Sequence, residues 1–208
     1  MSKEELENSI NFKFDKPVAL VTFHPVTLED ELVEDQFNEL LNSFEAQNEL
    51  KIIFTKANAD PNGVIINEMI DSYVAKKPER TVAFASLGAL KYLSTLKYCT
   101  LVVGNSSSGI IEAPIFKIPT INIGDRQKGR IQVESIINCK TKKEDITKAI
   151  NMALSEEFFN HIKHMKTPYE KEHTSSEIVQ IVKRLLWNET IDLKKKFYNL
   201  DISTKFHS

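Results

Sequence analysis

Short apolar runs alternate with helical patterns along most of the chain. The runs are rich in β-branched residues and lack polar alternation, which is typical of strands that are covered on both faces. We therefore predict strands over residues 17–23, 51–55, 81–84, 100–103, 119–123 and 135–139.

Helical periodicity is clearest between the first two predicted strands. Val33, Phe37, Leu40 and Phe44 recur at the spacing of one helix face. Further helices are predicted over residues 63–74, 89–98, 107–116, 143–155 and 176–186. Pro114 is expected to bend or shorten the helix that contains it, because proline cannot donate a backbone hydrogen bond. Alternating strands and helices predict βαβ units, and so an α/β fold with a doubly wound parallel sheet.

Composition excludes several classes of protein. The 208 residues include 27 basic and 29 acidic side chains, so no overall charge favours nucleic acid or a membrane as partner. No signal peptide and no apolar run near the length of a membrane span are present. Cys99 and Cys139 form no CxxC pair, which indicates thiols in a reducing compartment and a cytoplasmic location. No cluster with metal-ligand spacing is found, and no metal site is predicted.

Polar residues follow four of the predicted strands at the point where each strand ends. His24 follows the first, Asn58 the second, the loop Gly104–Gly109 (GNSSSG) the fourth, and Arg126 the fifth. Ligands of open α/β sheets bind beyond the carboxyl ends of the strands. These residues are therefore expected to share one rim that suits an anionic, hydroxylated ligand.

The loop after the fourth strand has the composition of a phosphate site. Ser106 and Ser107 supply hydroxyls, and the following helix supplies free amides at the positive end of its dipole. Serine is also a preferred helix N-cap, so capping alone is the alternative interpretation. Glu112, a little further along the same helix, can accept hydrogen bonds from the two hydroxyls of a ribose. An ordinary solvent-exposed glutamate is the alternative there.

Two further residues have a functional and a structural interpretation. Arg126 carries a planar fork that can clamp a diphosphate, although Lys128 and Arg130 in the same loop are compatible with an ordinary solvated arginine. His24 can act as a general acid or base, or donate to a phosphate, although a lone histidine is more often structural.

The motifs resemble those of one known enzyme family. They are VTFHPVTLE (21–29), KANADPNG (56–63), FASLGALKYLSTLKYCTLVVGNSSSGIIEAP (84–114) and IPTINIGDRQKGR (118–130). In this order they resemble the C-terminal half of the UDP-N-acetylglucosamine 2-epimerases, most closely the hydrolysing branch. A basic residue is common in that family at the position of Val64, so one ligand contact of the family is expected to be missing here.

The resemblance implies a fold and a set of site residues. The fold is a Rossmann-like domain, the C-terminal half of a two-domain enzyme of the GT-B type that binds UDP or UDP-N-acetylglucosamine. The phosphate-binding serines of the family correspond to Ser106 and Ser107, and its ribose-binding glutamate to Glu112. His24 is implied as the catalytic histidine beside the diphosphate, with further nucleotide contacts from Asn58 and Arg126. The uracil is expected against the backbone within residues 84–92.

The resemblance also implies a reaction. The sugar nucleotide eliminates UDP to give a 2-acetamidoglucal, and water is then added to give N-acetylmannosamine, without a metal or redox cofactor. The N-terminal Rossmann-like half, which carries the acids for proton transfer, is absent, so the isolated chain is expected to be inactive. A non-catalytic UDP-binding module and the nucleotide-sugar half of a GT-B glycosyltransferase are the alternatives.

Domain organisation follows from the same patterns. Residues 1–187 are predicted as the UDP-binding domain. Residues 188–208 are polar with scattered apolar side chains, and are predicted either to pack on the missing N-terminal domain or to be a frayed terminus. Apolar surface left without its partner domain can also drive formation of a homo-oligomer.

Overall fold

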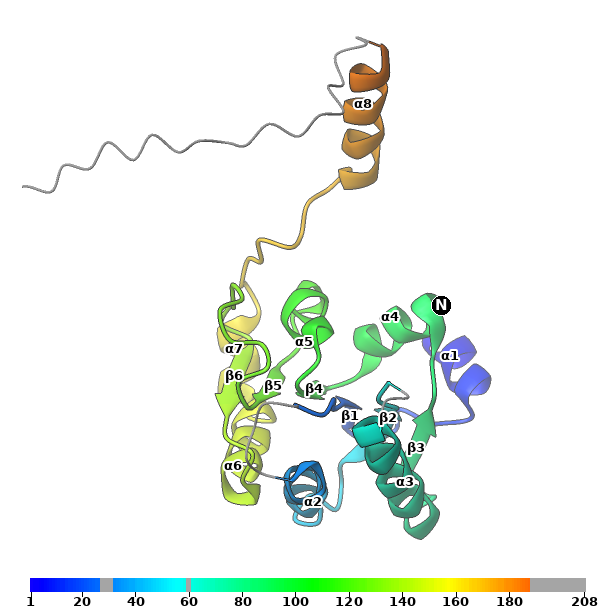
Figure 1. Ribbon diagram of the computed structural model, residues 1–208, viewed down its shortest axis with the longest axis vertical. Coiled ribbons are helices and arrows are strands. Elements are labelled where there is room, and N and C mark those ends of the chain that lie inside the picture. Colours follow the sequence, from blue (N-terminus) through cyan, green and yellow to red (C-terminus); the bar gives the residue numbers. More distant parts are fainter. Residues whose placement is uncertain (27–31, 59–60, 188–208) are drawn as a thin grey trace, which may run out of the picture. The chain divides into compact units, whose positions relative to one another are not determined.

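A parallel sheet of six strands forms the centre of the protein, in the order β3-β2-β1-β4-β5-β6 (Figure 1). The computed structural model describes residues 1–26, 32–58 and 61–187. They fall into two units, Met1–Glu170 and a second that begins at Lys171, and each is described on its own. The strands are β1 (Val18–Thr22), β2 (Lys51–Thr55), β3 (Thr81–Phe84), β4 (Leu101–Gly104), β5 (Thr120–Ile123) and β6 (Ile136–Cys139).

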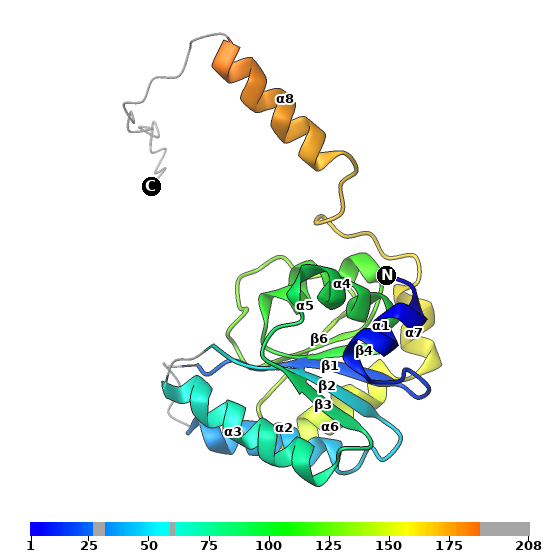
Figure 2. The same cartoon turned by 90° about the vertical axis from the view of Figure 1, so that its right-hand side faces the viewer.

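Helices cover both faces of the sheet (Figure 2). One layer consists of α2 (Val33–Phe44), α3 (Pro61–Lys76) and α6 (Lys143–Ala153). The other consists of α1 (Lys3–Ile10), α4 (Gly88–Tyr98), α5 (Ser107–Ile111) and a short 3₁₀ helix, η1 (Ala113–Phe116). Helix α7 (Glu156–Ile162) follows α6 and packs against it. The predicted α/β fold with a doubly wound parallel sheet is confirmed.

All six predicted strands are present, each within one residue of its expected limits at either end. Helices α1 and α7 were not predicted. Each buries only two apolar side chains, Leu6 and Ile10 in α1, and Phe158 and Ile162 in α7. Two buried positions are too few to establish a helical period in the sequence.

The continuous apolar strands reflect burial on both sides. Along β1, Ala19 and Val21 point into the core between the sheet and the layer of α2, α3 and α6. Val18 and Leu20 point into the core on the side of α1 and α4. Successive side chains of a strand alternate between the two faces, so a strand between two helical layers buries side chains on both of them and is mostly apolar.

Two glycines allow close approach near the centre of the sheet. Gly104, at the end of β4, is paired with Thr22 of β1 and has a φ of +135°. A Cβ atom there would lie 1.9 Å from the carbonyl oxygen of Thr22. Gly109 in α5 allows that helix to pack on β5, since a Cβ would lie 2.8 Å from Cγ2 of Thr120. The shortening expected from Pro114 is also confirmed, because α5 ends at Ile111 and Pro114 lies in η1.

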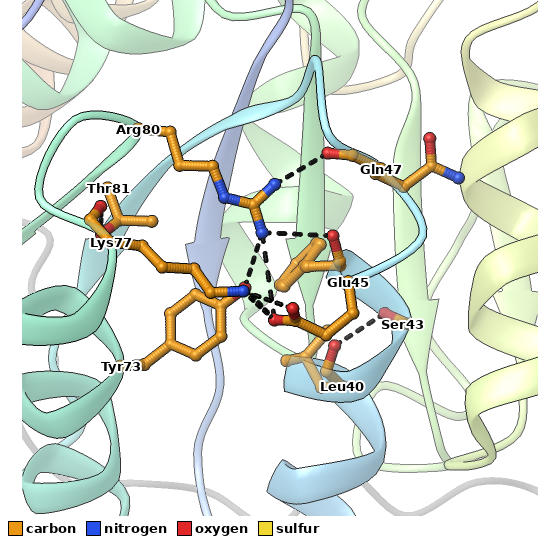
Figure 3. Close-up of polar contacts among 9 residues, drawn as sticks. Leu40, Ser43, Glu45, Gln47, Tyr73, Lys77, Arg80 and Thr81 are labelled. Carbon is orange, nitrogen blue, oxygen red and sulfur yellow. Dashed lines mark hydrogen bonds and ion pairs between the residues drawn. The ribbon is translucent and has the colours of Figure 1, made fainter.

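An ion-pair cluster joins the end of α2 to the end of α3 (Figure 3). Tyr73 donates a hydrogen bond of 2.9 Å to Glu45, and Lys77 donates to both carboxylate oxygens of Glu45. Arg80 donates to the hydroxyl of Tyr73 (3.0 Å) and to the backbone carbonyl of Gln47 (2.9 Å). The cluster thus fixes the two helices through charged partners rather than through apolar packing alone.

Replacing Tyr73 with phenylalanine is expected to lower the free energy of unfolding by about 1–2 kcal/mol at neutral pH, because a bond to a carboxylate is lost. Burial, and then the bond to Glu45, raise the pKa of Tyr73 to about 12. In the unfolded chain this pKa is about 10. Folding therefore favours the neutral phenol. The contribution of Tyr73 to the free energy of unfolding is fully present below pH ~10 and is lost as the pH rises through about 12.

Urea denaturation of both proteins at neutral pH and between pH ~10 and ~12 checks this prediction. Tyr169→Phe is the control, since the Tyr169 hydroxyl donates to an exposed backbone carbonyl, that of Ile131, and not to a carboxylate. A difference between wild type and Tyr73→Phe that stays constant over the whole pH range would contradict it.

The second unit contains α8 (Thr174–Trp187), which carries exposed large apolar side chains on a helix without buried residues. The predicted tail, residues 188–208, lies outside the described residues. Among the helices that the structure describes, none is long and apolar enough to cross a membrane. Both cysteines are free thiols; Cys99 is buried and Cys139 is partly exposed.

Candidate functional site

The centre of the sheet is a topological switch point. Strands β1 and β4 are neighbours, yet the chain continues from β1 towards β2 and from β4 towards β5, in opposite directions. The connections therefore leave on different sides and open a crevice beyond the carboxyl ends of the two strands. Thr22 pairs with Gly104, so the residues that follow them, His24 and Asn105–Ser107, lie at this crevice.

The side chain of Asn105 joins the loop after β1 to the loop after β4. Its amide nitrogen donates to the carbonyl of His24 (2.8 Å), and its amide oxygen accepts from the backbone N–H of His24 (2.7 Å). Its own backbone N–H donates to the carbonyl of Thr22 (3.2 Å). His24 is thus fixed next to the serine loop, as the sequence predicts.

The loop after β5 is joined to the same point. The guanidinium of Arg126 donates to the backbone carbonyl of Asn105 (3.1 Å), and the side-chain amide of Gln127 donates to the same oxygen (2.8 Å). Gln127 is buried, whereas Arg126 is exposed apart from this contact. Three loops that are distant in sequence therefore meet at the end of β4.

Ser106 and Ser107 begin the turn into α5, and both are half-buried. Ser106 is the N-cap of α5, and its hydroxyl accepts from the N–H of Ser108 at 3.4 Å. The capping interpretation thus holds for Ser106, while a ligand can still approach the remaining lone pair and proton of its hydroxyl. Glu112 is the C-cap residue of α5, directly after its last residue Ile111, and is also half-buried.

A pocket of ≈ 340 Å³ lies beside the serine turn. Tyr92 of α4 lies in its wall and donates a 2.6 Å hydrogen bond to the hydroxyl of Ser108. Burial raises the pKa of Tyr92, the bond to Ser108 opposes the rise, and the negative charge of Glu112 adds to it. Glu112 itself does not line this pocket. The residues that line it are Thr22, Thr55, Ala85, Ser86, Leu87, Gly88, Ala89, Tyr92, Ser106 and Ser108.

Most of the residues that line this pocket were not predicted individually as site residues. The segment 84–92, expected to face the uracil, contributes six of the ten lining residues, but Tyr92 and Ser108 were not identified individually. Asn105 and Gln127 were also missed. Their only signal in the sequence is a polar residue directly after an apolar strand or inside a loop, which does not distinguish a buried amide from an exposed one.

No hydrogen bond described for this part of the chain joins Asn58 to the other predicted site residues. Asn58 is exposed and follows β2, the neighbour of β1, and residues 59–60 after it lie outside the described part of the chain. A larger hollow of ≈ 590 Å³ lies between α2 and α3, and no predicted site residue lines it. Within residues 1–26, 32–58 and 61–187, no group of three or more His, Cys, Asp or Glu side chains has the geometry of a metal site.

Comparison with known proteins gives consistent results. The family model of UDP-N-acetylglucosamine 2-epimerase matches residues 1–183. A GDP/UDP-N,N'-diacetylbacillosamine 2-epimerase (hydrolyzing) of Campylobacter jejuni is 42% identical over 158 residues, which are 76% of this chain and 41% of that protein. The polysialic acid biosynthesis protein P7 of Escherichia coli is 36% identical over 200 residues, 96% of this chain and 50% of that protein.

Solved structures share the fold at low sequence identity. The UDP-GlcNAc 2-epimerase of Neisseria meningitidis bound to UDP-GlcNAc superposes with a TM-score of 0.70 at 13% identity, covering 88% of this chain and 49% of that one. A glycosyltransferase of kitacinnamycin superposes with a TM-score of 0.55 at 12% identity, covering 82% and 43%. These structures thus share the Rossmann-like α/β fold of this chain, which covers about half of each of them. The chain spans about half the length of the curated relatives it matches, and it belongs to the UDP-N-acetylglucosamine 2-epimerase family.

Proposed function

We propose that this chain is the C-terminal, UDP-binding half of a hydrolysing 2-epimerase that acts on a UDP-activated 2-acetamido sugar. The observation that carries this proposal is the meeting of three loops at Asn105. His24, the serine turn and Arg126 come from separate parts of the sequence and are tied together at the switch point by hydrogen bonds. Membership of the 2-epimerase family supports the same assignment.

Each predicted residue has a role in this proposal. The amides and hydroxyls of Ser106 and Ser107 bind the diphosphate, and Arg126 neutralises its charge. Glu112 accepts hydrogen bonds from the ribose hydroxyls, and the nucleobase occupies the pocket bordered by Tyr92. Asn58 is proposed as a further nucleotide contact from the loop after β2.

The proposed reaction has two steps. A base removes the proton from C2 of the sugar while the C1–O bond breaks, and UDP leaves with the electron pair of that bond. Water then adds its hydroxyl to C1 and a proton to C2, which gives the 2-epimer of the free sugar. The contribution of this chain is electrostatic, because the serine turn, Arg126 and His24 stabilise the charge that develops on the departing diphosphate.

The identity of the sugar is open between two classes. Two of the curated relatives are named for N,N'-diacetylbacillosamine, and another is named for UDP-N-acetylglucosamine. Both sugars carry a 2-acetamido group, which is the part that the proposed reaction needs. Assays with both UDP-sugars, and titration with GDP beside UDP, distinguish the sugar and the base.

The proton-transfer groups are proposed to belong to an N-terminal half that packs against this chain. The exposed apolar side chains of α8 support this proposal, among them Ile178, Val179, Ile181, Val182, Leu185 and Leu186. We propose the same partner for residues 188–208. A homo-oligomer, a UDP-binding module without catalysis and a GT-B transferase half are the alternatives, and size measurement, UDP titration and an assay with sugar acceptors distinguish them.

Replacing Ser106 and Ser107 together with alanine is expected to weaken UDP binding by about 1–3 kcal/mol, because hydrogen bonds to a charged group are lost. Kd would rise roughly 5- to 150-fold, measured by isothermal titration calorimetry on the whole chain. The control is Ser175→Ala with Ser176→Ala, an adjacent serine pair at the beginning of α8. Unchanged UDP affinity in the Ser106/Ser107 variant would count against the phosphate site.

A further inference from the structure

Asn105 is the most connected polar residue at the rim and has no role in the reaction proposed so far. It is 1% exposed and lies one residue beyond β4. Its side chain uses both a donor and an acceptor on one residue, His24, and its backbone carbonyl accepts from Arg126 and Gln127. Asn105 therefore contacts every loop that the proposed diphosphate site needs.

The side chain of Asn105 bonds both backbone groups of His24, as the backbone of a neighbouring strand does in a sheet. The side-chain amide of Asn105 pairs with both backbone groups of His24, at 2.7 and 2.8 Å, while the Asn105 N–H donates to Thr22. A residue held at both its N–H and its C=O cannot rotate its backbone without breaking a buried bond. The Cα–Cβ bond from which the His24 side chain extends therefore has a fixed direction relative to the serine turn.

The carbonyl of Asn105 holds the opposite side of the rim. Arg126 reaches it from the loop after β5 at 3.1 Å, and Gln127, 2% exposed, at 2.8 Å. This contact leaves the other guanidinium nitrogens of Arg126 available, since a guanidinium has five N–H donors. The same contact places a positive charge next to the serine turn.

We propose that Asn105 is the positioning residue of the diphosphate site, which orients His24 through its side chain and Arg126 through its backbone carbonyl. The inference rests on the proposed function. Asparagine fits this role because it offers a donor and an acceptor on one short side chain. Aspartate keeps the acceptor for the His24 N–H but turns a negative oxygen towards the His24 carbonyl. Leucine keeps the size and loses both bonds.

The test is a double-mutant cycle read out as UDP affinity. Asn105→Ala is expected to raise the Kd for UDP about 10- to 100-fold, and Asn105→Asp to raise it by a similar factor, on the scale of losing contacts to a charged ligand. In a His24→Ala background, Asn105→Ala is expected to add much less, because the side chain then has no catalytic histidine to orient. Equal factors in both backgrounds would show a merely structural role and overturn the proposal.

Asn122→Ala is the matched control. Asn122 is 2% exposed, lies on the neighbouring strand β5 and donates a 2.7 Å hydrogen bond to the side chain of Asn138. This variant removes a buried amide of the same kind from the same sheet, and the bond that it breaks involves neither His24 nor Arg126. UDP affinity is expected to stay within about twofold of wild type, and a loss as large as that of Asn105→Ala would overturn the proposal.

Amide hydrogen exchange of His24 separates this inference from the proposed function. In Asn105→Ala the His24 amide is expected to exchange at least about tenfold faster than in wild type, while amides of β1 stay protected, because its buried acceptor is gone. An unchanged rate at His24 would overturn the inference whether or not UDP binds. Absence of UDP binding by the wild-type chain, with fast exchange in the variant, would instead contradict the proposed function alone.

Discussion

Gly104→Ala is expected to destabilise the protein by about 4–5 kcal/mol or more, which is a large part of the 5–15 kcal/mol that roughly bounds the stability of a domain. The new Cβ would lie 1.9 Å from the carbonyl oxygen of Thr22 and 2.7 Å from its carbon. Both atoms belong to the backbone of β1, so no side-chain rotation can relieve the clash. The φ of +135° is unfavourable for alanine as well.

Urea denaturation followed by circular dichroism measures this effect. Gly129→Ala is the control, because Gly129 also has a positive φ, +83°, but a Cβ added there would meet no atom within 4 Å. It is expected to cost only about 1–2 kcal/mol, the strain of the left-handed conformation. A Gly104→Ala protein with the midpoint of the Gly129→Ala protein would show that β1 and β4 do not approach as closely as described.

The chain by itself is expected to release no free 2-epimerised sugar from a UDP-2-acetamido sugar, whereas a mixture with the proposed N-terminal half should do so. The reason is that general acids and bases each contribute about 10²- to 10⁴-fold to the rate, and we propose that those of the sugar site lie on the other half. The part of the Escherichia coli relative that this chain does not cover, about half of its length, is the partner to add. Product release followed by chromatography measures the outcome.

Two variants make this experiment specific. His24→Ala in the mixture is expected to abolish the restored activity. Ile181→Glu with Leu185→Glu in α8 is expected to prevent restoration while leaving UDP binding intact, because both side chains are exposed and apolar. If the chain alone turns over the substrate, and His24→Ala abolishes that activity, the proposal that the proton-transfer groups lie on the other half is contradicted.

The strands were predictable because burial on both faces leaves a pattern that depends only on local composition. Residues 51–55 and 81–84 were predicted with the limits that β2 and β3 have. Helix α7 was not predicted, because its seven residues bury only Phe158 and Ile162. Short helices that are stabilised by packing on a neighbour, here α6, carry little signal of their own.

The part of the site that could be predicted consists of residues that directly follow a strand. The position of His24, Ser106 and Arg126 after strands placed them on one rim, because parallel strands of a sheet end at the same edge. The hydrogen bonds that hold the rim were not predictable. Asn105 was seen as part of a serine-rich loop, and nothing in the sequence indicated that its amide is buried against His24.

By itself, the sequence determined the alternation of strands and helices and the residues that follow each strand, since both are local properties of the chain. Only the tertiary structure decided which strands are neighbours, and so which loops meet. The pairing of Thr22 with Gly104 brings together residues 82 positions apart, and the hydrogen bonds of Asn105 depend on that pairing. Such contacts arise from packing over long sequence distances, where no local pattern of apolar and polar residues carries information.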